Sequence, residues 1–119
     1  MGLLEELGNL GVDVKDGLDR VMGDASLYEM MLGMFVDAVN NNPISLADFD
    51  ENDLDGLIKS IHTLKGITGN LSLTPLFQGY NQSLMLLRDG KPAPAKKEFE
   101  QLLPTQAKIL ECITSHQGA

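Results

Sequence analysis

The sequence is poor in cysteine and in long apolar runs, and each shortage excludes a class of protein. A single cysteine, Cys112, rules out an internal disulfide and any metal site built from several thiolates. No apolar run approaches the roughly 18 residues that a membrane-spanning helix needs, and the N-terminus lacks the basic and then apolar profile of a signal peptide. We therefore expect a cytoplasmic protein that does not enter membranes, with Cys112 as an inert side chain.

Basic residues are also scarce. Nine Lys and Arg residues stand against 17 Asp and Glu residues, which gives a formal net charge of −8. Nucleic acids and anionic membranes are bound through clustered Lys and Arg, so neither is an expected partner. A chain of 119 residues, 43% of them hydrophobic, is long enough for one core. We expect one domain over 1–119, and we expect it to be a monomer. Because the chain starts at Met1 and ends soon after the last predicted helix, a free-standing protein is favoured over one domain of a hybrid kinase.

Alternating strand patterns are almost absent, and apolar residues recur instead at helical intervals. Helices are predicted within 3–7, 12–23, 24–43, 53–71, 73–90 and 95–115, with a loop over 44–53. Four of them have the length of bundle helices and are joined by short connections. The predicted fold is therefore all-α: an antiparallel four-helix bundle with one or two short N-terminal helices capping one end.

Individual residues indicate where these helices begin and end. Ser26 and Glu29 have the spacing of a capping box, and Thr74 is a capping residue that precedes a proline. Pro104 is expected to kink or split the last helix. The Met-rich stretch YEMMLGMF at 28–35 is interpreted as core filler rather than a binding groove, because Met at helical spacing is usually buried.

The stretch IHTLKGITGN at 61–70 places a histidine, a lysine and two glycines inside the predicted helix 53–71. At roughly 100° of rotation per residue, the apolar stripe of this helix is centred about 120° from His62. The histidine therefore belongs to the flank or outer face of the helix. The residues that lie within about 60° of it on the same surface are Lys59, Lys65, Gly66 and Gly69.

The two glycines need an explanation, since a glycine inside a helix costs about 1 kcal/mol relative to alanine. Close packing against another helix is one reason for a glycine pair. The other reason is access, because a bare surface beside an imidazole lets a bulky group reach a ring nitrogen. Lys65 would stabilise a phosphate bound there. We favour access, and with it a nucleophilic His62 that becomes phosphorylated.

At these residues the sequence resembles the histidine phosphotransfer (HPt) domains of phosphorelays. Their signature is His-x-Leu-Lys-Gly followed by small residues, and HTLKGITGNL at 62–71 matches it, while 11–35 resembles their N-terminal half. The resemblance implies a four-helix bundle that is a phosphoryl carrier and not an enzyme. His62 would accept a phosphoryl group from the aspartyl phosphate of a response-regulator receiver domain and pass it to another receiver.

The resemblance also implies roles for neighbouring residues. Lys65 would stabilise the phosphoryl oxygens, and Gly66 would keep the approach open. The chain itself would bind no cofactor, because the receiver supplies the Mg²⁺ ion. Receiver domains and a hybrid sensor histidine kinase are the expected partners. The receiver would contact the residues around the histidine, namely Ile58, Lys59, Gly69 and Asn70.

Two positions depart from the family pattern. Leu84 stands near the place where many members have a Gln or Glu that orients the imidazole, so Asn81 or a water molecule would have to do this instead. Ser72 stands where many members have glycine.

Two other functions stay open. One is a module that docks on a receiver or kinase without being phosphorylated. The other is the excised substrate domain of a chemotaxis-type histidine kinase. A metal-bound His62 is not expected, because no His or Cys lies at metal-ligand spacing from it and His116 falls in a C-terminal tail that is expected to fray.

Overall fold

The computed structural model describes residues 2–117, and these residues contain helices and no strand. The predicted all-α class is therefore confirmed. The helices are α1 (Leu3–Asn9), α2 (Val14–Arg20), α3 (Ala25–Asn41), the short 3₁₀ helix η1 (Leu46–Asp50), α4 (Asp55–Asn70), α5 (Thr74–Arg88) and α6 (Pro92–Gln117). None of the helices in this range combines the length and the apolar character that crossing a membrane would take.

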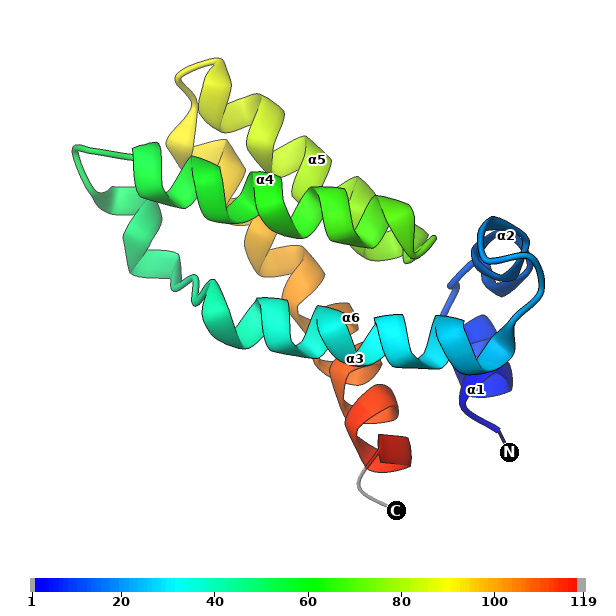
Figure 1. Cartoon of the computed structure of the whole chain (residues 1–119). Coiled ribbons are helices and arrows are strands. Elements are labelled where there is room, and N and C mark those ends of the chain that lie inside the picture. The colour runs from blue at the N-terminus through cyan, green and yellow to red at the C-terminus, as the bar shows by residue number, and fades with distance from the viewer. Residues whose placement is uncertain (1, 118–119) are drawn as a thin grey trace.

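Helices α4 and α5 run side by side, and α6 packs along α5 and also contacts η1, α3 and α1 (Figure 1). The short helices α1 and α2 lie at the end of the molecule where α3 begins and α4 ends. One core connects all these elements. Its fully buried side chains include Tyr28, Leu32, Phe35, Ile61, Leu64, Leu76, Tyr80, Leu84, Phe99, Ile109 and Ile113.

Several predicted helix boundaries differ from the observed ones. Helix α3 is capped by Asp24, whose carboxylate accepts a 3.0 Å hydrogen bond from the Leu27 N–H, so the predicted capping box at Ser26 is wrong. Thr74 is the first residue of α5 rather than its cap. The predicted loop at 44–53 contains η1, in which the Asp48 carboxylate accepts a 2.8 Å hydrogen bond from the N–H of residue 45.

The last helix is longer than predicted, because α6 begins at Pro92 and continues without a break through Pro104. A proline inside a helix removes one backbone hydrogen bond and costs about 3 kcal/mol. Here the Pro104 ring is exposed, while apolar side chains on both sides of it, such as Leu102 and Ile109, are buried in the core. Core burial before and after the proline therefore keeps α6 in one piece.

The interpretation of the Met-rich stretch as core filler is wrong for two of its residues. Met30 and Met34 are each 61% exposed on α3, whereas Leu32 and Phe35 supply the buried face of that helix. Large side chains at neighbouring helical positions cannot all face one core. The branched and aromatic residues take the interior, and the methionines form an apolar surface.

Tyr28 of α3 is hydrogen-bonded to the turn that follows α4. Its ring is fully buried, and its hydroxyl donates a 2.6 Å hydrogen bond to the carbonyl oxygen of Leu71. Burial raises the pKa of Tyr28 to about 12, so the hydroxyl remains a donor at neutral pH. In the same turn the carbonyl of Ser72 accepts a 3.1 Å hydrogen bond from the Asp13 N–H. This turn therefore joins α4 to both α3 and the start of α2.

Tyr28→Phe should lower the free energy of unfolding by about 1 to 2 kcal/mol, because it leaves the buried Leu71 carbonyl without this donor. The measurement is urea unfolding followed by circular dichroism. Ser83→Ala is the matched control, since the Ser83 hydroxyl is buried and has no partner within residues 2–117. Removing that hydroxyl should not destabilise the protein. Equal losses for the two variants would contradict a specific role for the Tyr28 hydrogen bond.

Candidate functional site

The rotational setting of α4 decides which of its residues are accessible. Ile61, Leu64 and Thr68 are buried on the side that faces the core. The Thr68 hydroxyl donates to the carbonyl oxygens of Leu64 and Lys65 at 2.8 and 3.0 Å, so this buried polar group is paired within the helix. His62 lies on the opposite side and is exposed, as the sequence predicted.

The imidazole of His62 has no hydrogen bond or ion pair with any of residues 2–117. Lys59 is exposed and Lys65 is half-buried, and neither ammonium group pairs with a carboxylate of the described chain. The site thus combines a ring whose nitrogens are available with two cations that are not neutralised. Such an arrangement suits a group that gains negative charge.

The structure separates the roles of the two glycines. At Gly66 an added Cβ atom would meet nothing within 4 Å, so no neighbouring element requires glycine there. At Gly69 the same atom would lie 3.2 Å from the ring of Phe77 on α5. Gly69 therefore serves the close packing of α5 on α4, whereas packing does not explain Gly66. The expectation that both glycines keep the surface open is corrected for Gly69.

The residues considered for orienting the imidazole do not do so. Leu84 is buried in the core, and the side-chain amide of Asn81 donates to the sulfur of Met85 at 3.7 Å. Neither of them bonds to His62 in the described chain. Within residues 2–117, no hydrogen bond from a protein group therefore fixes the rotation of the His62 ring.

Ser72, the second departure from the family pattern, has a structural explanation. Its φ of 57° lies in the left-handed region, where glycine is the least strained residue. The Ser72 hydroxyl donates a hydrogen bond to the Asp16 carboxylate, which also pairs with Arg20 at 2.9 Å. The Ser72 and Arg20 contacts lower the pKa of Asp16. A side-chain hydrogen bond to α2 thus accompanies the unfavourable backbone conformation.

The four predicted contact residues all lie on α4 around the histidine. Lys59 and Asn70 are exposed, and Ile58 and Gly69 are half-buried. Beside Asn70 the surface continues onto α3 through an apolar hollow of about 180 Å³. Its lining residues are Met31, Met34, Ile67, Asn70 and Leu71. Sequence reasoning missed the α3 part, and the signal for it was the Met-rich stretch assigned to the core.

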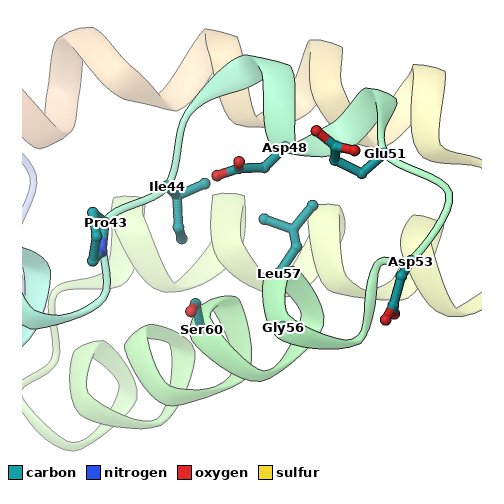
Figure 2. Close-up of a pocket in the computed structure, with 8 residues that line it drawn as sticks. All are labelled: Pro43, Ile44, Asp48, Glu51, Asp53, Gly56, Leu57 and Ser60. Carbon is teal, nitrogen blue, oxygen red and sulfur yellow. The ribbon is translucent and has the colours of Figure 1, made fainter.

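A larger hollow of about 450 Å³ lies between η1 and the start of α4, away from His62. Figure 2 shows the carboxylates of Asp48, Glu51 and Asp53 around it, with Leu57 and Ser60 on the α4 side. Ser60 is about 160° from His62 around the helix axis at roughly 100° per residue, so the hollow opens on the other face of α4. It is not part of the histidine site.

A second cluster of ionisable side chains joins α1 to the last turns of α6. Glu6 of α1 contacts both His116 and Cys112 of α6. Because residue 116 is still helical and half-buried, the expectation that it belongs to a frayed tail is wrong. Burial and the neighbouring Glu6 raise the pKa of the Cys112 thiol to about 11. In the absence of a bound metal ion this thiol is protonated at neutral pH. It is then a poor nucleophile, in line with the sequence interpretation of Cys112 as inert.

Comparisons of the chain with protein-family models, curated proteins and solved structures give no match.

Gly66→Ala should raise the free energy of unfolding by about 0.5 to 1 kcal/mol, because alanine favours the helix and the added methyl group meets no neighbour. Gly69→Ala should gain clearly less, or lose stability, because the Phe77 ring would have to move. Parallel urea unfolding of the two variants measures the difference. An equal gain in both variants would show that Gly69 is not required for packing.

Proposed function

We propose that this protein is a phosphoryl carrier of the HPt kind, with His62 as the phosphoryl acceptor. The supporting observation is an exposed imidazole with no partner in residues 2–117, one helical turn from open space at Gly66. A histidine that stabilised the fold would be packed or hydrogen-bonded. A glycine that served packing would have a neighbour at its Cβ position, as Gly69 does.

In the proposed reaction an unprotonated ring nitrogen of His62 attacks the phosphorus of an aspartyl phosphate in line with the leaving oxygen. The N–P bond forms as the P–O bond to the aspartate breaks, and the bonding electrons leave with the carboxylate. The second ring nitrogen keeps its proton. In the next transfer an aspartate carboxylate of another receiver attacks the phosphorus, and the imidazole is the leaving group.

In the proposed carrier, Lys59 and Lys65 would supply the positive charge that stabilises the phosphoryl group. Lys65 lies on the row next to His62 and would attract the phosphoryl oxygens through its ammonium group, which acts as a compact point charge. Lys59 lies on the other neighbouring row and would add to the positive potential. The receiver would supply the Mg²⁺ ion and its own lysine. The chain would then need no bound cofactor.

We propose that α3, α4, α5 and α6 form an antiparallel four-helix bundle that holds the histidine on a rigid helix. Residues on a packed helix are positioned more precisely than residues on loops. The proposed partners are receiver domains and a hybrid sensor histidine kinase in the cytoplasm, and the carrier would act as a monomer. Ile58, Lys59, Gly69 and Asn70 would contact the receiver over a small, transient interface of about 1,200 Å² or less.

His62→Gln should abolish labelling of the protein by a phosphorylated receiver while the helical circular dichroism spectrum stays unchanged, because the side chain is exposed and makes no contact that supports the fold. The measurement is transfer of radiolabelled phosphate, resolved by electrophoresis. Label on the wild type should be lost in acid and retained in base, as expected of a phosphoramidate. Binding of the receiver without labelling of the wild type would instead indicate a docking module.

Gly66→Leu should block phosphoryl transfer without lowering the melting temperature, since it places a branched side chain about 5 to 6 Å from the imidazole. Gly66→Ala is the matched control, and its small methyl group should leave most of the rate. Lys65→Ala should slow transfer by roughly ten- to a hundredfold, because it removes one charge-assisted contact but leaves access open. Transfer at the wild-type rate by Gly66→Leu would contradict the access role of this glycine.

A further inference from the structure

Glu6, Cys112 and His116 form a compact group of three potential metal ligands. Cys112 and His116 are four residues apart on α6, so their side chains lie on the same face of that helix one turn apart. Glu6 approaches them from α1: its Oε2 atom is 2.6 Å from His116 Nε2 and 3.5 Å from Cys112 Sγ. All three ligand atoms lie within 4.8 Å of one another.

We propose that these three side chains bind one Zn²⁺ ion, which would link α1 to the C-terminal end of α6. Thiolate, imidazole and carboxylate are the three protein ligand types of zinc, and the thiolate and imidazole favour zinc over Mg²⁺ or Ca²⁺. Tetrahedral coordination at ordinary zinc–ligand distances places ligand atoms about 3.3 to 3.6 Å apart. The observed separations of 2.6 Å, 3.5 Å and at most 4.8 Å differ from these values by about 1 Å or less.

The surroundings leave room for the ion and a fourth ligand. A hollow of about 390 Å³ adjoins the cluster, and both Glu6 and Cys112 line it. A water molecule in this hollow would complete the tetrahedron. Two charged side chains also line it: Glu111 favours a cation there, and Lys108 opposes one. All three ligand residues are half-buried, so an ion has access from solvent.

Zinc binding would exchange the proton of the Cys112 thiol for the metal ion. Zn²⁺ would form a bond to the Cys112 sulfur as that thiol releases its proton to solvent. His116 would bind through an unprotonated ring nitrogen, and Glu6 through its carboxylate. The Glu6–His116 contact at 2.6 Å would be replaced by a bond from each residue to the ion. No oxidant or reductant takes part.

The proposed zinc site is separate from the histidine site. The last turns of α6 lie on the opposite side of α3 from α4 in Figure 1. None of the three zinc ligands belongs to α4 or contacts His62. The zinc proposal therefore stands whether or not the protein carries a phosphoryl group, and a His62 variant serves as its control.

The test is titration of the reduced, metal-free full chain with Co²⁺, which substitutes for zinc and has absorption bands that report on its ligands. A thiolate-to-cobalt charge-transfer band and the visible bands of a tetrahedral ion should appear at one equivalent and disappear when Zn²⁺ is added. His62→Gln should behave like the wild type. Cys112→Ala should lose the charge-transfer band.

His116→Gln and Glu6→Gln should weaken Zn²⁺ binding by at least the roughly 10- to 100-fold that loss of even an outer-shell partner costs. Isothermal titration calorimetry measures that change, and circular dichroism confirms that each variant is folded. At one fixed Zn²⁺ concentration, the rise in melting temperature should be as large in His62→Gln as in the wild type and clearly smaller in His116→Gln. Absence of the charge-transfer band, or wild-type zinc affinity in His116→Gln and Glu6→Gln, would overturn the proposal.

Discussion

The burial of one face of α4 is the constraint on which the histidine site depends. Ile61, Leu64 and Thr68 are held in the core, and each is nearly or fully inaccessible. Because a helix turns by roughly 100° per residue, fixing these positions also fixes the direction of His62. Its exposure therefore follows from apolar packing. The hydrogen bond from Tyr28 to Leu71 reinforces this setting, since it ties the end of α4 to α3.

The proposed chemistry does not require a deep cavity. In phosphoryl transfer most of the catalysis comes from positioning and electrostatic stabilisation, and a partner can supply much of both. The carrier then needs a nucleophile, nearby positive charge and space. In the proposed mechanism, His62, Lys65 and Gly66 would provide these on one helix surface. None of these three residues lines the hollows of about 450, 390 and 370 Å³ in the described chain, which agrees with a site built for a protein partner rather than a small molecule.

Local sequence patterns predicted the features that depend on helical periodicity, namely the extent of a helix and the face on which a residue lies. The helix expected at 53–71 is observed as Asp55–Asn70, and the exposure of His62 followed from its angle to the apolar stripe. Features that depend on contacts between distant elements were not predictable in this way. Phe77 packs on Gly69, core residues hold α6 together at Pro104, and Glu6 meets His116 across 110 positions. None of these pairings leaves a signal within one helix. The exposed Met30 and Met34 show the same limit, because composition does not determine which apolar residues face the core.

The central claim is that His62 is the residue that accepts phosphate. The most direct test is tandem mass spectrometry, at neutral pH, of the wild-type protein after incubation with a phosphorylated receiver domain. The account predicts one phosphoryl group per chain, located on the peptide that contains His62 and assigned to its imidazole. A phosphoryl group on His116 or on a serine, threonine or aspartate, with His62 unmodified, would contradict it.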